Sequence, residues 1–590
     1  MNTYFWRARA GFFHDFGGWQ LSASEAFTSN LAEFAGVARE QAVRDENQFQ
    51  AELVHQIQSG WTVRAQVSNF TLSDSRSLFR NDALANAVAL GMGFAPSSLL
   101  LLSVLAGAKA EQQLAQPSSG ITYALSAQLD SLRVGSLSAF SSLNLSEEFL
   151  SPRRNQTALA TLVLRQNYSD AASLSLSGGY ERVQRDFFSN VFFTGSPENP
   201  QVAVERRVDQ NLYTLDSISY HLTEALSVVA RFELRYRLVR RENSQQFLDI
   251  SRSLYDNEIA QQRLLTQASA LYRTASLQLS FSFLYQQQSE TYRPINASQN
   301  VPEALRLERL RNNAFEVAAL VCGAEWHLRD ETGEPINRLA LQYQMRGFRF
   351  DTPSPENNDD RDEVSYFLTL SDSVRLSKFL GISLLLSGAL SRNVFIFRQQ
   401  SANSTDNYIL RLSPAVWWRV GETFRNYAEF GVLANYTVYP FETVQSVRSF
   451  SFRQFNFLDS AEICLSKTFF LKLLYDQRIY ERAELLWRDF AERPLNSFND
   501  RLMHIEAWLR REQLAVAAGV RVFWRQQFGF LGAVPRLQQE VLYFGPTARI
   551  TYYPAPQTEL EASGWYQVEQ LDGTVIRIIP NLTLAVQFSW

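Results

Sequence analysis

ALSVVARFELRYRLVR, residues Ala225–Arg240, is the most informative stretch of this sequence of 590 residues. Every second residue from Leu226 to Leu238 is apolar or aromatic, and most of the positions between them are charged. The charged members are Arg231, Glu233, Arg235 and Arg237. Successive side chains of a β-strand point to opposite faces, whereas a helical period would spread these charges around the axis. The stretch therefore predicts a strand with one apolar face and one charged face.

The same period of two residues recurs from end to end of the chain. Clear examples are Ala171–Tyr180, Ser276–Gln288 and Thr558–Glu569, in which Leu, Phe or Tyr share one face and Ser, Gln or Glu share the other. Counting such segments predicts an all-β fold, a single large closed antiparallel transmembrane β-barrel of about 26–28 strands.

The connections between these segments are alternately short and long. Short turns are expected at Tyr168–Ala172, His221–Glu224, Arg273–Ser276, Leu376–Phe379, Val420–Thr423, Lys467–Phe469, Arg511–Gln513 and Pro554–Gln557. Longer polar loops are expected at Pro197–Arg207, Arg241–Ala260, Thr291–Asn312, Thr352–Asp362 and Leu485–Asp500. A soluble β-sandwich has no reason to keep this alternation, whereas a membrane barrel does.

The composition agrees with a barrel and disagrees with a helical membrane protein. Aromatic residues make up 13% of the chain, while the mean hydropathy is only −0.20. The longest apolar run, Ser97–Ala108, is shorter than the roughly 18–20 residues that a membrane-spanning helix needs. We expect two strands on either side of a turn at Ala95–Ser98 rather than a helix.

The end of the chain carries the sharpest motif. The apolar residues Leu582, Leu584, Val586, Phe588 and Trp590 alternate with small or polar residues, and the last residue is aromatic. This pattern resembles the C-terminal signature of bacterial outer-membrane β-barrel proteins, in which a terminal Phe or Trp ends an amphipathic last strand. The resemblance implies that the barrel-assembly machinery reads this strand as an assembly signal.

The resemblance also implies a location and a surrounding. The chain would be a multi-pass β-barrel of the bacterial cell outer membrane, in contact with outer-membrane lipid and lipopolysaccharide, with short periplasmic turns and longer extracellular loops. Its strand count is similar to that of the large barrels that sheath decahaem cytochromes or insert lipopolysaccharide. The disulfide-bonded cysteines typical of many lipopolysaccharide-insertion barrels are absent, and the exact family is not identified.

We expect residues 1–590 to form one barrel domain with no separate plug domain. An odd strand count leaves two alternatives open: the count is wrong by one, or an upstream strand precedes Met1. The sequence shows no signal peptide, so an export signal has been cleaved, omitted or lost upstream.

Nothing in the sequence indicates an enzyme, and we expect no catalytic residue, no cofactor and no metal. The five histidines form neither an H-E-x-x-H pair nor a haem-attachment site, and there is no G-x-S-x-G or Walker motif. A net charge of −4 argues against a nucleic-acid partner, which would call for a clustered basic face.

The polar face of the strands is the candidate for function, because it would line the lumen. Beyond the charged residues of Ala225–Arg240, the lumen-lining candidates are Lys472, Asp476, Arg478, His504, Glu506, Arg510, Arg521 and Arg525. Charged rings of this kind tune ion selectivity in channels. The other reading is a solvated wall whose charges neutralise one another.

Three functions remain open at this point. The first is an outer-membrane channel or porin-like conduit with a polar, charged lumen. The second is a scaffold barrel that houses a partner, such as a multihaem cytochrome, a periplasmic lipoprotein plug or a secretion component. The scaffold hypothesis follows from the width of the barrel, since side chains cannot fill a barrel of more than 20 strands. The third is a surface structural or adhesin barrel.

Overall fold

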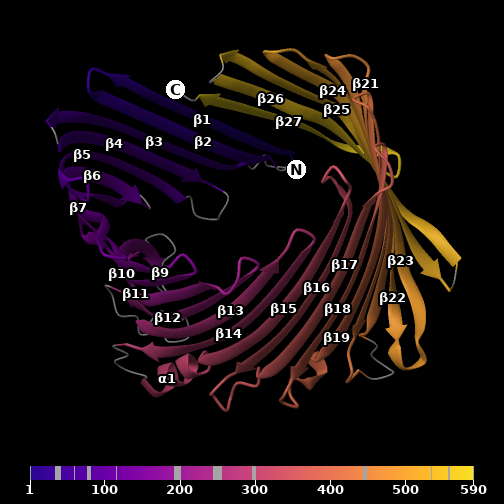
Figure 1. Ribbon diagram of the computed structural model, residues 1–590, viewed down its shortest axis with the longest axis horizontal. Helices are drawn as coiled ribbons and strands as arrows, with labels where there is room; N and C mark the ends of the chain where they lie inside the picture. The colour runs from indigo at the N-terminus through magenta and orange to yellow at the C-terminus, as the bar shows by residue number, and fades with distance from the viewer. Residues whose placement is uncertain are drawn as a thin grey trace.

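In the computed structural model the chain forms one antiparallel sheet of 27 strands, wound into a ring (Figure 1). The structure describes residues 2–33, 41–58, 60–75, 81–113, 116–191, 201–243, 256–295, 301–442, 448–532, 534–555 and 558–588. The strands are β1 (Asn2–Phe16), β2 (Trp19–Glu33), β3 (Gln41–Gln58), β4 (Trp61–Asp74), β5 (Asn81–Ser97), β6 (Leu100–Gln113), β7 (Gln116–Val134), β8 (Leu137–Ser151), β9 (Arg153–Ser169), β10 (Ala172–Val191), β11 (Gln201–His221), β12 (Leu226–Asn243), β13 (Asn257–Arg273), β14 (Leu277–Pro294), β15 (Asn313–Arg329), β16 (Pro335–Asp351), β17 (Arg361–Arg375), β18 (Leu380–Phe395), β19 (Thr405–Val420), β20 (Phe424–Val438), β21 (Phe450–Cys464), β22 (Phe469–Leu486), β23 (Ala491–Arg510), β24 (Leu514–Leu531), β25 (Val534–Ala555), β26 (Thr558–Leu571) and β27 (Thr574–Phe588).

Each strand pairs with the next along the chain, so the barrel is a continuous series of hairpins. The first and last strands, β1 and β27, lie beside each other where the ring meets itself (Figure 1). Among the described residues no ladder of hydrogen bonds joins these two strands. The predicted antiparallel barrel and its strand count are confirmed, and the ring is nearly closed.

The ladder register keeps one apolar face and one polar face in phase from strand to strand. On β5 the residues Leu84, Val88, Leu90 and Met92 stand on the same face as Val104 and Ala106 of β6, and Leu90 is 65% exposed. A closed sheet satisfies its backbone groups internally, so such a face needs only to be apolar to lie against lipid. We assign this face to the outside and the polar face to the interior.

Most of the apolar run Ser97–Ala108 belongs to strand β6. β5 and β6 meet at a turn at residues 98–99, which confirms the prediction of two strands rather than a helix. In the described part of the chain, no helix is both long and apolar enough to cross a membrane.

Short turns follow every odd-numbered strand, and the longer connections all follow even-numbered strands. The predicted alternation is incomplete, because the connections after β6, β8, β22, β24 and β26 are short as well. In the turn between β1 and β2, Gly17 and Gly18 have φ values of +59° and +84°, the left-handed backbone that two-residue hairpin turns require. The connection between β14 and β15 contains the one helix longer than a single turn in the described chain, α1 (Val301–Arg309). Pro302 near its start and Arg306 and Arg309 in its last turn suit the two ends of a helix.

Two predicted loops are wrong, one of them in part. Residues 201–207 of the expected loop Pro197–Arg207 are the first residues of β11 and pair with β10. Leu485–Asp500 was expected to be a long polar loop, but β22 continues to Leu486 and β23 begins at Ala491, with only a 3-10 turn (Trp487–Asp489) between the paired strands. The ladder continues from Leu485 opposite Glu492 down to Arg478 opposite Asp500. Polar residues form strand here because these hairpins extend past the height of the membrane, where both faces can be polar.

Outward-facing aromatic residues mark one membrane interface at the short-turn end of the barrel. Trp19, Trp61, Tyr168, Tyr220, Tyr272 and Tyr552 lie within a few residues of short turns, in phase with the apolar face. The register also places Trp418 outward, whereas the ring of the neighbouring Trp417 lies over Gly381 on the inner face. Strands of 14–22 residues exceed the roughly 9–11 that a membrane needs, so the opposite end projects beyond the bilayer.

Candidate functional site: the inward-facing wall

The charged residues of β12 share the inward face. Arg235 stands between Tyr213 of β11 and Arg263 of β13, and Arg237 stands between Asn211 and Gln261. Arg231 and Glu233 occupy the same face, four and two residues before Arg235. These four side chains therefore point into the enclosed space together with polar neighbours on the adjacent strands.

Carboxylates neutralise part of the β12 group. Arg237 Nε donates to Asp209 Oδ1 at 2.9 Å, and Arg207 lies 3.8 Å from the same carboxylate. Glu233 Oε1 lies 3.4 Å from Arg235 Nε and 3.9 Å from an Arg263 nitrogen. Asp209 and Glu233 each serve two arginines, so this section of the wall carries more positive than negative charge.

The remaining lumen candidates lie together on β22, β23 and β24, on a different part of the ring (Figure 1). The ladder puts Lys472 opposite Glu506, Arg478 opposite Asp500, and His504 opposite Arg521. Arg525 Nε and Nη2 donate to the two oxygens of Asp500 at 2.8 and 2.7 Å. Arg478 donates to Asp476 at 2.7 Å, so most charges of this group are paired.

The other members of this group sit against aromatic rings or polar groups. The Lys472 ammonium is 5.0 Å from the centre of the Trp508 ring, and Arg510 lies 5.5 Å from that of Phe470. His504 Nε2 lies 3.2 Å from Thr547 Oγ1, and Glu506 accepts a hydrogen bond of 3.2 Å from Trp508 Nε1. Arg521 lines a recess of about 260 Å³ with Phe523 and Trp565, among others.

Sequence reasoning missed several partners in the wall. Asp500 was assigned to a loop, and Asp209, Arg263 and Thr547 were not singled out, although each contacts a candidate residue. Their inward phase could have been found from the period of two. Their contacts could not, because the pairing register between neighbouring strands is not readable from one strand alone.

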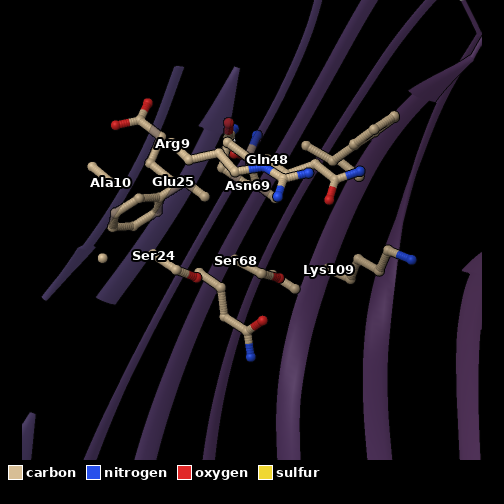
Figure 2. A pocket seen from close by; sticks show the side chains of 16 residues that line it. Arg9, Ala10, Ser24, Glu25, Gln48, Ser68, Asn69 and Lys109 are labelled. Carbon is tan, nitrogen blue, oxygen red and sulfur yellow. Dashed lines mark hydrogen bonds between the residues drawn. The ribbon is translucent and has the colours of Figure 1, made fainter. Parts of the chain in front are cut away.

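A recess of about 530 Å³ lies on the same inner face across β1 to β6. Its floor is made by small residues such as Ser24, Ser68 and Ala87, and Arg9, Gln48 and Lys109 stand around them. Figure 2 shows that these side chains come from strands lying side by side, with Ser68 between Ser24 and Lys109. Lys109 is bound to Glu148 at 2.9 Å, which neutralises the recess on one side.

β27 contains Leu582, Leu584, Val586 and Phe588 of the C-terminal motif. Leu582 and Leu584 pair with Gly564 and Ala562 on the outward face of β26, and the backbone ladder continues with Val586 opposite Leu560 and Phe588 opposite Thr558. Trp590 lies outside the described residues. Recognition of this strand by the barrel-assembly machinery stays a prediction.

A nearly closed antiparallel barrel with an apolar outer face, an aromatic girdle and a polar inner face defines the class of protein. The chain is a large transmembrane β-barrel of the outer-membrane class. Within the described residues, no group of three or more His, Cys, Asp or Glu side chains is arranged to hold a metal ion.

Comparisons with known proteins identify no family. No protein-family model matches the chain, and no curated protein matches it. Among solved structures, the copper transporter OprC is 10% identical, with a TM-score of 0.39 over 86% of this chain and 75% of that one. The FrpB iron transporter from Neisseria meningitidis (F3-3 variant) is 10% identical, with a TM-score of 0.39 over 90% and 81%.

The outer membrane transporter YddB from Escherichia coli is 8% identical, with a TM-score of 0.36 over 97% of this chain and 80% of that one. Similarity at this level concerns the barrel architecture alone and says nothing about what this chain carries or binds.

Proposed function

We propose that the chain forms a conduit across the outer membrane and that its charged inner wall contacts whatever passes through. The observation that carries the proposal is the continuous inward-facing polar face around so many strands. A circular barrel of 27 strands, spaced about 4.8 Å apart and tilted by about 40°, would be about 54 Å across at the backbone. Side chains cannot fill such a width, since barrels of 16–18 strands already leave an aqueous channel.

Planar-bilayer recording of the purified chain tests the conduit. We expect large, steady single-channel currents, because an open lumen of this width presents little resistance to ions. Reversing charge in the wall with Arg231→Glu and Arg235→Glu should shift the reversal potential toward cations in a salt gradient. The matched variant Gln278→Glu and Gln286→Glu adds two charges on the same face of β14, and it should shift the potential less because it removes no arginine.

A barrel that remained electrically silent while correctly folded would contradict an open conduit. The same width supports a second candidate function, a scaffold that houses a partner protein. An unfilled lumen of this size would let folded periplasmic proteins escape, which an occupant would prevent. A subunit that co-purifies in a fixed ratio and closes the barrel to current would favour the scaffold.

A further inference from the structure

Arginines are opposed to one another across neighbouring strands on the inner wall between β10 and β13. Arg185 of β10 stands directly opposite Arg207 of β11, and Arg207 stands opposite Arg241 of β12. Arg235 of β12 stands opposite Arg263 of β13. Residues directly opposite in a ladder have Cβ atoms about 4.5–5.5 Å apart, and like charges in such pairs destabilise the sheet. This part of the wall therefore concentrates positive charge, although the repulsion between the arginines destabilises the sheet.

The carboxylates nearby do not balance these arginines. Asp209 and Glu233 are each shared between two guanidinium groups, as described above. Among the residues that the structure describes, Arg185, Arg231 and Arg241 have no carboxylate within ion-pair distance. Arg263 Nε has no hydrogen-bond acceptor in the described chain, and Arg235 Nε has only the Glu233 oxygen 3.4 Å away. The side chains of Arg235 and Arg263 are 40% and 32% exposed, so the ends of their guanidinium groups can contact a bound anion.

These arginines enclose a recess rather than a flat surface. A cavity of about 410 Å³ is lined by four arginines, two carboxylates and an amide: Arg185, Arg207, Arg235, Arg237, Glu181, Asp209 and Asn211. The arginines outnumber the carboxylates in this lining by two. Its volume is ample for a phosphate or diphosphate group together with water. The planar guanidinium fork matches the oxygens of a phosphate with two parallel hydrogen bonds, which a chloride ion cannot accept in the same way.

We propose that this recess, the arginine recess, binds multivalent oxyanions of the phosphate class on their way through the lumen. Passage of the oxyanions through the lumen rests on the proposed conduit, whereas their binding in the arginine recess does not. The arginine recess is preferred to the recess on β1 to β6, where Lys109 already has Glu148 as a partner. Bound oxyanions would relieve the repulsion in the pairs Arg185 with Arg207 and Arg235 with Arg263.

Calorimetric titration of inorganic pyrophosphate into the purified barrel in detergent tests the binding, at constant ionic strength in chloride. We expect saturable binding that Arg185→Gln with Arg207→Gln weakens at least about tenfold, since each lost charge-assisted contact contributes about 1.5 kcal/mol or more. Arg185→Lys with Arg207→Lys keeps the charge but loses the fork, and it should give an intermediate affinity.

The matched control removes two inward-facing arginines that already have a carboxylate beside them. Arg411 lies 3.4 Å from Glu429, and Arg338 pairs with Glu325. Arg338→Gln with Arg411→Gln should leave pyrophosphate affinity within about twofold of the native barrel. An equal loss of pyrophosphate affinity in the control and test variants would overturn the proposal, because the affinity would then depend only on the total charge of the lumen.

Further outcomes separate this inference from the conduit. Absence of saturable binding in a folded, conducting barrel overturns the arginine recess and leaves the conduit intact. Saturable binding in a folded barrel that carries no current supports the recess and contradicts the conduit. An acidic co-purifying protein that Arg185→Gln with Arg207→Gln releases, together with no pyrophosphate binding once that protein is removed from the native barrel, overturns the proposal in favour of a protein-docking surface.

Discussion

At the scale of single residues, the inner wall is arranged by cross-strand ion pairs. Asp500 is 8% exposed and is held by two hydrogen bonds from Arg525. Removing one partner of such a pair lowers the stability of the fold more than removing both, because the remaining charge is left without an opposite charge beside it.

We expect Arg525→Gln to lower the unfolding temperature of the barrel in detergent. The double variant Arg525→Gln with Asp500→Asn should recover part of the loss. Arg525 is 41% exposed, so water screens the pair and the coupling should be about 0.5–1 kcal/mol. Thermal unfolding followed by circular dichroism measures the four members of this cycle, and strictly additive effects would show that the two residues are not coupled.

A second residue-scale prediction concerns pH. In the turn between β15 and β16, the Thr332 hydroxyl donates to Asp330 at 2.6 Å, and the backbone N–H groups of Glu334 and Thr332 donate at 2.9 and 3.0 Å. These hydrogen bonds, with Arg375 nearby, lower the pKa of Asp330 below its ordinary value of about 3.9. A lowered pKa means that the carboxylate stabilises the folded turn above pH 4 and loses this effect as pH falls through its folded pKa.

Asp330→Asn should therefore lower the unfolding temperature at neutral pH, and the difference from the native barrel should shrink below pH 4. Unfolding temperatures of both proteins, measured from pH 7 to pH 2.5, test this. A difference that stays constant over the whole range would mean that the charge of Asp330 plays no part.

At the scale of strands, the sequence predicts each element well and their mutual register poorly. The alternation in Ala225–Arg240 defines both faces of β12 because every second side chain must meet lipid. The same reasoning failed at Leu485–Asp500, where a hairpin projects past the membrane and its outer face is no longer required to be apolar. The arginine pairs of the arginine recess depend on register between strands, and no single strand contains that information.

The two faces of one strand should respond oppositely to the same substitution. Phe283 of β14 faces outward and Ser282 faces inward. Phe283→Arg should impair insertion, because a cation on the lipid face near the bilayer centre costs about 2–4 kcal/mol. Ser282→Arg should insert nearly normally. The fraction that resists unfolding in cold detergent on a gel measures insertion, and equal impairment by both variants would contradict the assigned faces.

At the scale of the whole molecule, the seam between β1 and β27 differs from every other strand boundary. Each internal strand pairs on both sides, whereas in the described chain β1 pairs with β2 alone and β27 with β26 alone. Backbone N–H groups that face the seam consequently lack the ladder partners found elsewhere.

Hydrogen exchange should therefore be faster in β1 and β27 than in the paired interior of the sheet. Mass spectrometry of peptides from Asn2–Phe16 and Thr574–Phe588, compared with peptides from β11 and β12, measures the difference. Protection in the first and last strands equal to that in β11 and β12 would show that the ring is fully hydrogen-bonded in the membrane.

The odd number of strands also has a consequence for sidedness. After an odd number of crossings a polypeptide emerges opposite to where it entered, so Asn2 of β1 and Phe588 of β27 belong to different surfaces of the membrane. With the short turns in the periplasm, β1 starts on the cell exterior and β27 finishes inside. An epitope joined at the first strand would be visible to antibodies on intact cells, and one joined after the last strand would be hidden until the envelope is opened.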